Sequence, residues 1–314
     1  MILVGTCGWS RIYQFLPPSK RRGRTNLEAY SDLFPAVEIN SSFYRFHKVE
    51  TYRKWRKSVP EGFEFTVKCH RSITHDWALR PTDEAHDNMS QMFEAARACG
   101  ARVLLLQTPA SLEACPEALD MAAAFFERMS NASVRLAWDT RGASWETEEA
   151  GSALREVLER FDVVHVTDPM KLDPVWFGDF AYFRLHGLPG YNLRYSYTNR
   201  QLEELQRRLK RFEGVDRVYV FFNNYAMYRD AYRFQRLLDE GRLPPTPFGS
   251  SSVSWALRAF DDWPANKDDL LRRCSRWRCW VTPDRSVHLG EVLRHFEERV
   301  YKGLEDIEQE SRHI

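Results

Sequence analysis

The sequence predicts a (β/α)8 barrel with an appended C-terminal helical extension. Eight short apolar runs alternate with longer helical patterns, and the chain has 314 residues. Barrels of about 250 residues routinely form one domain, so the length does not require two. We therefore predict a barrel over residues 1–244 and an extension over residues 245–314. An open, doubly wound parallel sheet is the alternative that the same alternation permits.

The predicted strands are runs rich in β-branched and aromatic residues, bounded by turn residues. Such runs are typical of strands that are buried on both faces of a parallel sheet. They cover residues 2–6, 36–40, 63–68, 102–107, 134–139, 162–168, 181–186 and 218–223.

Helical patterns with recognisable ends lie between these strands. Gly100 is typical of a helix C-terminus, and Pro116 is typical of a first helical turn. Residues 169–180 contain two prolines and no helical pattern, so this connection should be short or irregular. The predicted helices cover residues 26–34, 49–59, 82–100, 116–129, 144–161, 198–214 and 227–241.

The C-terminal extension begins with a linker rich in proline and serine at 243–253. A final amphipathic helix is predicted from apolar residues at helical spacing. We expect the extension to pack on the barrel or to mediate contacts. The apolar stripe consists of Leu289, Val292, Leu293, Phe296, Val300, Leu304 and Ile307.

Charge and cysteine content narrow the classes of protein. The 45 basic and 44 acidic side chains leave a net charge of +1, which excludes a global attraction to nucleic acid. No Gly-x-Gly-x-x-Gly or P-loop motif is present, which argues against dinucleotide and P-loop classes. Six scattered cysteines, no signal peptide and no run of about 20 apolar residues predict a cytoplasmic protein without a membrane span.

Polar side chains follow the ends of most predicted strands. Residues two apart share a strand face, and the apolar face of a barrel strand lies against the helices, so the polar face should point inward. Barrels carry their active sites at the strand carboxyl ends. The candidate site residues at these ends are Glu38, Asn40, Lys68, Gln107, Asp139, Arg141, Asp168, Arg184, His186 and Asn223. Because buried charges need partners, we expect Glu38, Asp139 and Asp168 to compensate Lys68, Arg184 and His186.

The first hypothesis for this site is an enzyme that hydrolyses a phosphoester or phosphodiester. Lys68 and Arg184 would hold the anion, because guanidinium and ammonium groups suit phosphate oxygens. Glu38 would be the general base and His186 the general acid.

The loop after the seventh strand, residues 186–199, offers glycines where barrels often bind phosphate. Arg194 and Tyr195 on this loop would hold the rest of the ligand.

Three alternatives remain open. Glu38 and Asp139 could act as the paired carboxylates of a glycoside hydrolase, which makes Asp139 a third catalytic candidate. A nucleic-acid-binding protein without catalysis could use the basic segments 19–24 and 272–280, since arginines beside aromatics suit phosphate contact and base stacking. The thiols of Cys7 and Cys69 are candidate nucleophiles, although most cysteines are small buried residues.

The cofactor is unknown from the sequence. A divalent metal would need carboxylates and histidines that converge. The candidates are Glu38, Asp139, Asp168 and His186, with His75 after the third strand, but no His-x-His or His-Glu-x-x-His spacing supports them.

Motifs at the strand ends resemble the YecE-like family, a domain of unknown function, over roughly residues 1–240. This resemblance implies a TIM-barrel fold and no agreed activity. The motifs are GTCGW (5–9), VEINSSFYR (37–45), PEGFEFTVK (60–68), ITH (73–75), LLLQTP (104–109), FRLHG (183–187) and VYVFFNN (218–224).

Overall fold

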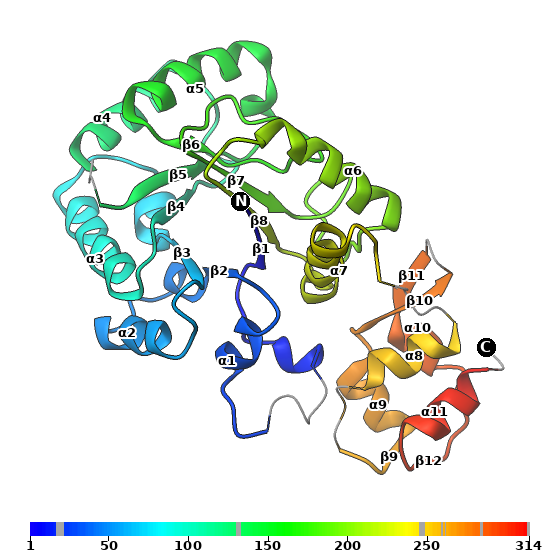
Figure 1. Ribbon diagram of the computed structural model, residues 1–314. Helices are drawn as coiled ribbons and strands as arrows, with labels where there is room; N and C mark the ends of the chain where they lie inside the picture. Colours follow the sequence, from blue (N-terminus) through cyan, green and yellow to red (C-terminus); the bar gives the residue numbers. More distant parts are fainter. Residues whose placement is uncertain are drawn as a thin grey trace. The chain divides into compact units, whose positions relative to one another are not determined.

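The chain forms two compact units in the computed structural model (Figure 1). The described residues are 1–16, 22–129, 133–244, 249–258, 260, 262–282 and 285–312. The first unit comprises Met1–Trp9, Ser31–Leu185 and Arg207–Asn223, and the second comprises Ser10–Tyr30, His186–Gln206 and Asn224–Ile314. The predicted boundary between residues 244 and 245 falls inside the second unit.

Eight parallel strands of the first unit form the predicted barrel. They are β1 (Ile2–Thr6), β2 (Ala36–Ile39), β3 (Glu64–Lys68), β4 (Val103–Gln107), β5 (Arg135–Asp139), β6 (Val164–His165), β7 (Phe180–Leu185) and β8 (Arg217–Phe222), in the order β6-β5-β4-β3-β2-β1-β8-β7. A parallel bridge between Thr167 and Phe183 joins the two ends of this order. The backbone N–H of Arg184 also donates to Thr167 O at 2.9 Å. The barrel is therefore closed, and the open-sheet alternative is wrong.

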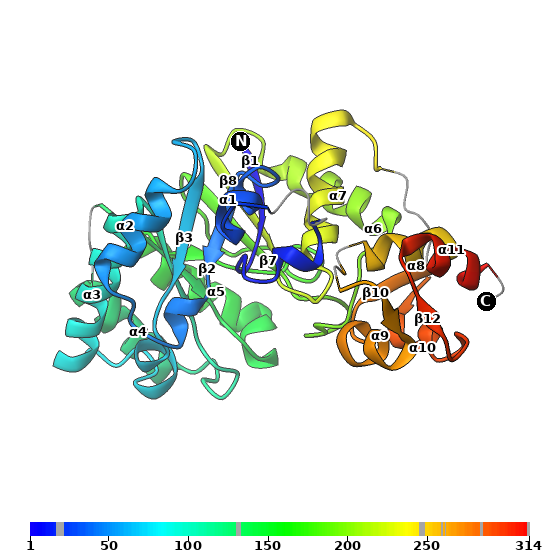
Figure 2. The same ribbon diagram turned by 90° about the horizontal axis from the view of Figure 1, so that it is seen from below.

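Helices follow the strands where the sequence predicts them, and Figure 2 gives a side view of the barrel. The helices are α1 (Asn26–Ser31), α2 (Val49–Lys57), α3 (Asp83–Cys99), α4 (Pro116–Met129), α5 (Glu148–Phe161), α6 (Asn199–Leu209) and α7 (Met227–Glu240). Short helical turns are η1 (Ile12–Gln14), η3 (Ser41–Phe43), the π-helical η4 (Ser72–Asp76), η5 (Ala143–Glu146) and η6 (Lys210–Phe212). Thr82 caps α3 by accepting from Ala85 N, and Gly100 ends it at φ 70°.

The sixth strand is the least regular of the eight. The prediction placed it at 162–168, but β6 covers only Val164–His165. Asp162 instead caps α5 in a left-handed conformation at φ 54°. The backbone N–H of His165 donates to Trp176 O at 3.0 Å, so the following connection folds back along the strand.

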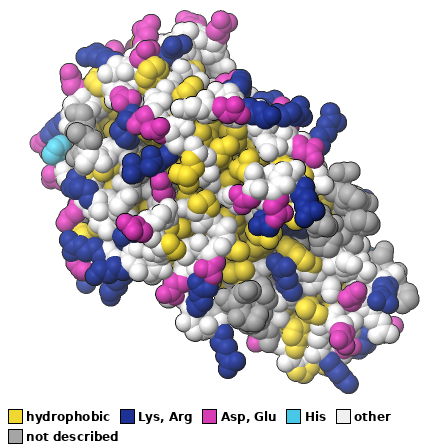
Figure 3. Space-filling model, in the orientation of Figure 1, with side chains coloured by type: hydrophobic (Ala, Val, Ile, Leu, Met, Phe, Trp, Pro, Cys, Tyr) yellow, Lys and Arg dark blue, Asp and Glu magenta, His cyan; other side chains and the backbone are white. Residues whose placement is uncertain are grey.

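Polar groups occupy the barrel interior at several levels, as expected when every second residue of a strand points inward. We call this alternation strand parity. Near the strand starts, Arg217 pairs with Glu64 at 2.9 Å, and Tyr219 donates to the same carboxylate. In the middle layer, Thr66 Oγ1 and Tyr182 Oη hydrogen-bond at 2.8 Å. On the face of the molecule in Figure 3, described side chains of both charge signs are interspersed, in keeping with the balanced composition.

The C-terminal part of the second unit contains the predicted appended helices, together with four short strands. Its elements are α8 (Ser250–Leu257), β9 (Ala265–Asn266), α9 (Lys267–Cys274), β10 (Arg278–Thr282), β11 (Arg285–His288), α10 (Leu289–Leu293), β12 (Val300–Tyr301) and α11 (Leu304–Ser311). Two antiparallel pairs, β10–β11 and β12–β9, hold this segment together.

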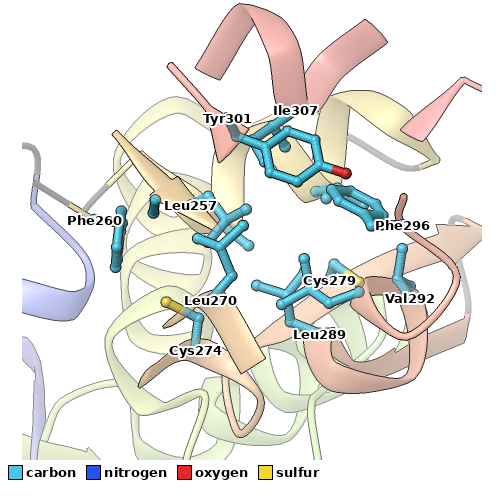
Figure 4. Close-up of a cluster of buried hydrophobic side chains, with 14 residues drawn as sticks. Leu257, Phe260, Leu270, Cys274, Cys279, Leu289, Val292, Phe296, Tyr301 and Ile307 are labelled. Atoms are coloured by element: carbon cyan, nitrogen blue, oxygen red, sulfur yellow. The ribbon is translucent and has the colours of Figure 1, made fainter. Parts of the chain in front are cut away.

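The prediction of a single final amphipathic helix is wrong. The chain leaves the helix after α10, passes through β12 and begins α11, while Leu289, Phe296 and Ile307 still meet in one buried cluster (Figure 4). The apolar residues at helical spacing therefore belong to the core of a segment that folds back on itself. Burying them does not require a single helix.

Arginine and aromatic side chains alternate in a stack within the second unit. Arg258 lies over the rings of Phe15 and Trp255, with its guanidinium carbon 5.3 and 3.9 Å from their centroids. Arg229 lies over Trp255 and Trp280, at 5.1 and 4.7 Å. Desolvated cation–π contacts of this kind can each contribute about 2 kcal/mol. We call this stack the arginine–tryptophan ladder.

Candidate functional site

A buried ion-paired cluster lies inside the barrel. Arg184 of β7 is only 1% exposed, and its two terminal nitrogens lie 2.9 Å from Glu38 Oε1 and 2.6 Å from Asp139 Oδ2. Burial acts to lower the pKa of Arg184, but the Glu38 and Asp139 carboxylates raise it well above its ordinary value. We call Glu38, Asp139 and Arg184 the inner cluster. The structure thus brings together three of the residues predicted to compensate one another.

Glu38 is fully buried, and both of its oxygens are engaged inside the protein. Oε1 pairs with Arg184, and Oε2 accepts a hydrogen bond from Tyr182 Oη at 2.8 Å. A general base must reach the proton that it removes. The structure therefore favours a positioning role for Glu38 over the predicted general-base role.

Asp139 links the inner cluster to the loop after β5. Its Oδ2 accepts from Arg184 and, at 2.7 Å, from Arg141, whose side chain is 21% exposed. Burial would raise the pKa of Asp139, but Arg141 and Arg184 outweigh it and hold the pKa below its ordinary value. A glycosidase acid needs a raised pKa, so this geometry does not favour the paired-carboxylate alternative.

Lys68 ends β3 and lies beside the inner cluster. Its Nζ donates to Gln107 Oε1 at 3.0 Å, and the same oxygen accepts from Arg184 at 3.0 Å. The ammonium group also lies 3.8 Å from the centroid of the Phe43 ring. Within the described part of the chain, no carboxylate forms an ion pair with Lys68. Burial, followed by the charge of Arg184, lowers its pKa to about 8.

Three further predicted residues lie at other strand ends of the first unit. Asn40 Nδ2 donates to Cys7 O at 3.1 Å, and no described group hydrogen-bonds with its buried Oδ1. Asp168 pairs with Lys171 at 3.8 Å. Asn223 is half-buried just beyond β8. Their contribution to a substrate site stays a prediction.

The loop after β7 belongs to the second unit. His186 is buried there and stacks on Tyr191, with ring centroids 5.0 Å apart. Arg194 is exposed, and Tyr195 is half-buried with its hydroxyl accepting from Gln201. The acid role of His186 and the ligand contacts of Arg194 and Tyr195 stay predictions.

Tyr182 and Phe43 contribute to the site but were not predicted. Tyr182 lies in an apolar run, and the signal that could have found it is its spacing of two residues from Arg184 on the same strand face. Phe43 follows β2 in η3, where no strand parity applies.

The predicted thiol nucleophiles are both buried. Burial raises the pKa of Cys7 well above its ordinary value, with the Glu38 carboxylate adding to the effect. Burial also raises the pKa of Cys69. Since the thiolate is the reactive form, neither environment favours thiol catalysis.

His165 of β6 is a buried neutral base beside Asp139. Its Nδ1 accepts from Val175 N at 3.2 Å, and burial lowers its pKa to about 4 although the Asp139 charge opposes this. The unfolded chain, with a histidine pKa near 6.5, therefore binds more protons. Stability should fall by up to about 3 kcal/mol as the pH decreases from 6.5 to 4.

Urea unfolding of His165→Gln at several pH values tests this. The variant should lose less stability than the native chain between pH 6.5 and 4.5, while His86→Gln, at an exposed histidine, should follow the native chain. Parallel curves for His165→Gln and the native chain would contradict the prediction.

Neither a metal-binding group nor a membrane-spanning helix is found among the described residues. No group of three or more His, Cys, Asp or Glu side chains in that part of the chain is arranged to hold a metal ion. None of the described helices has the length and apolar character that crossing a membrane requires.

The basic–aromatic segments predicted to contact nucleic acid are only partly described. Residues 19–21 of the segment 19–24 lie outside the described residues. In the segment 272–280, Trp280 is 1% exposed and Trp277 packs against the cluster of Figure 4. These rings are therefore occupied within the second unit and do not favour base stacking, while phosphate contact by the arginines stays a prediction.

A closed eight-stranded parallel barrel with a charged interior at the carboxyl ends of its strands defines the chain as a TIM-barrel protein. The sequence profile of the family described as "Protein of unknown function DUF72" matches residues 3–250. The chain belongs to this DUF72 family.

Curated relatives confirm the predicted YecE-like resemblance. The chain is 36% identical to UPF0759 protein YunF of Bacillus subtilis (strain 168) over 96 residues, which are 30% of this chain and 32% of YunF. It is 36% identical to UPF0759 protein YecE of Escherichia coli (strain K12) over 84 residues, 27% of this chain and 29% of YecE. The matched segments thus span about a third of these relatives.

A solved structure shows the same fold. The crystal structure of a DUF72 family protein from Enterococcus faecalis V583 matches with a TM-score of 0.63 and 19% identity, covering 79% of this chain and 100% of that one.

Proposed function

We propose that the chain is an enzyme that binds an anionic, phosphate-containing substrate at the carboxyl ends of the barrel strands. The inner cluster with Lys68 and Arg141 contains three cationic and two anionic side chains, which leaves one positive charge in excess. The observation that carries the proposal is Lys68, a cation that no carboxylate neutralises among the described residues. A buried excess charge of this kind favours an anionic ligand.

Arg141 is the proposed contact for the phosphate group. Arg184 was predicted to hold the anion, but its terminal nitrogens already pair with Glu38 and Asp139. Arg141 is more exposed than Arg184 and pairs with Asp139 at 2.7 Å. A guanidinium group has several N–H donors in a planar fork, which suits contact with a phosphate group.

Phosphoester or phosphodiester hydrolysis is the reaction that we propose from the sequence. Because both oxygens of Glu38 are engaged, we assign the base to Lys68 instead. A lysine with a pKa of about 8 is neutral often enough near pH 8 to accept a proton from water.

Thermal melting with inorganic phosphate and phenyl phosphate tests the binding step. Both ligands should raise the melting temperature of the native chain, because a ligand that binds only the folded state stabilises it. Arg141→Met should weaken binding by roughly tenfold, the effect of losing a charged hydrogen bond of about 1.5 kcal/mol. Arg155→Met, at an exposed arginine of α5, is the matched control and should bind like the native chain.

Equal stabilisation of the native chain and Arg141→Met would overturn the binding proposal. Hydrolysis of bis(4-nitrophenyl) phosphate reports on the reaction in the same proteins. If this substrate is turned over and Lys68→Met retains the full rate, the assignment of Lys68 as the base is wrong.

A further inference from the structure

We propose that the ε-amine of Lys68 is a nucleophile that forms an imine with a substrate carbonyl, so that the substrate class is a phosphorylated aldehyde or ketone. The inference rests on the proposed function for the phosphate group only. The reactivity of the amine is argued from the surroundings of Lys68 itself.

Burial distinguishes Lys68 from the other lysines. It is 8% exposed, and among the lysines in the described ranges it is the only one that is buried. Its backbone is held by Ser42, whose single hydroxyl hydrogen is shared between Lys68 O, 2.6 Å from Oγ, and Ile39 O, 2.8 Å from Oγ. The amine therefore starts from a fixed strand end, which reduces the entropy lost on reaching a reactive geometry.

The contacts of the amine leave its nitrogen available after deprotonation. The ammonium form donates to Gln107 Oε1 and faces the ring of Phe43. A neutral amine needs only one N–H for Gln107 and then carries a lone pair, which is what a nucleophile requires. An exposed lysine in an ion pair with a carboxylate would instead be held as the cation.

The buried surroundings of Lys68 favour the neutral amine. Burial and then Arg184 lower the pKa to about 8, whereas Glu38, Asp139 and Cys7 act in the opposite direction. At pH 7.5 about a quarter of the Lys68 amine is then neutral, against about one part in a thousand for an ordinary lysine. Desolvation beside a second cation is a recognised way to activate a lysine for imine formation.

Imine formation balances without an oxidant or a further reactant. The nitrogen lone pair of Lys68 attacks the carbonyl carbon, and the carbonyl π electrons move to oxygen, giving a carbinolamine. Both hydrogens of the amine leave with that oxygen as water, and a C=N bond remains. Borohydride reagents add hydride to the imine carbon, which fixes the adduct as a secondary amine.

Reductive trapping on the native chain tests the inference. The full-length protein is incubated with glyceraldehyde 3-phosphate and sodium cyanoborohydride, digested, and mapped by mass spectrometry. Lys68 should be labelled at least about tenfold faster than Lys54 or Lys57, exposed lysines of α2, because of its larger neutral fraction. Labelling confined to exposed lysines, with Lys68 unmodified, would overturn the inference without any variant.

Two variants supply the control for site assignment. Lys68→Arg retains the charge but has no nucleophilic amine, and it should remove the fast adduct while circular dichroism remains native-like. Lys54→Arg should leave that adduct unchanged. Persistence of the fast adduct in Lys68→Arg would assign it to another residue and refute the proposal.

The same experiment separates this inference from the proposed function. Glyceraldehyde without phosphate should label Lys68 more slowly than its phosphorylated form, because it lacks the group that Arg141 is proposed to hold. Equal labelling by both aldehydes would support Lys68 as the nucleophile and contradict the proposed phosphate site. A phosphate-dependent rise in melting temperature without any Lys68 adduct would support phosphate binding and refute imine formation by Lys68.

Discussion

Replacing Arg184 by methionine is expected to destabilise the protein by about 3–5 kcal/mol, the usual cost of removing one partner from a buried ion pair. Arg184 pairs with two carboxylates at once, and Glu38 has no exposed surface through which water could solvate it. Methionine fills similar space but leaves Glu38 without a cationic partner, while Asp139 keeps Arg141. Urea unfolding measures the loss as a lower midpoint at unchanged slope.

A surface pair gives the matched control for this effect. Arg211 pairs with Asp173, and both side chains are about half exposed, at 53% and 54%. Arg211→Met should therefore change stability by less than about 1 kcal/mol. Adding Glu38→Gln to Arg184→Met should recover most of the lost stability, because Asp139 still pairs with Arg141 and no unpaired carboxylate then remains. A loss for Arg184→Met as small as that for Arg211→Met would refute the buried-charge explanation.

Gly5→Ala is expected to cost about 3 kcal/mol or more, at the upper end for overpacked cores. Gly5 of β1 is in register with Ala36 of β2. A β-carbon at position 5 would lie 2.1 Å from the carbonyl oxygen of Ala36 and 2.9 Å from the ring of Phe221. Because backbone atoms of a neighbouring strand cannot move aside alone, relief would require separating β1 from β2.

Thermal or urea unfolding measures the effect of Gly5→Ala on the purified protein, and a low soluble yield points the same way. Gly62→Ala is the control, because a β-carbon there meets no atom within 4 Å. It should stay within about 0.5 kcal/mol of the native chain. Comparable stability of the two variants would contradict the prediction, because β1 and β2 would then be able to separate at little cost.

Local patterns predicted the barrel well because each of its strands has its own short apolar run. The exception, β6, shows the limit of such patterns, since Asp162 reads as part of a strand but serves as a helix cap. The C-terminal segment shows another limit. Apolar residues from Leu289 to Ile307 recur at helical spacing, yet all of them except the exposed Val300 meet in a cluster formed by two helices and a strand. Only tertiary packing decides whether such a pattern forms one helix or several shorter elements.

Strand parity predicted which charged residues share the barrel interior but not their roles. It brought Glu38, Asp139 and Arg184 together correctly. It could not show that Tyr182 and Arg184 engage both oxygens of Glu38, because those partners lie about 145 residues away along the chain, at separations of 144 and 146. The position of the Lys68 ammonium against Phe43 is likewise a product of folding.

The arginine–tryptophan ladder has a consequence for shortened forms of the protein. The stretch that matches the DUF72 family ends at residue 250, so Arg229 lies inside it, whereas both indoles that sandwich Arg229 lie beyond it. A gene cut at the family limit would encode a helix with a bare guanidinium and no aromatic cover. The region beyond residue 250 therefore supplies both aromatic rings that cover Arg229.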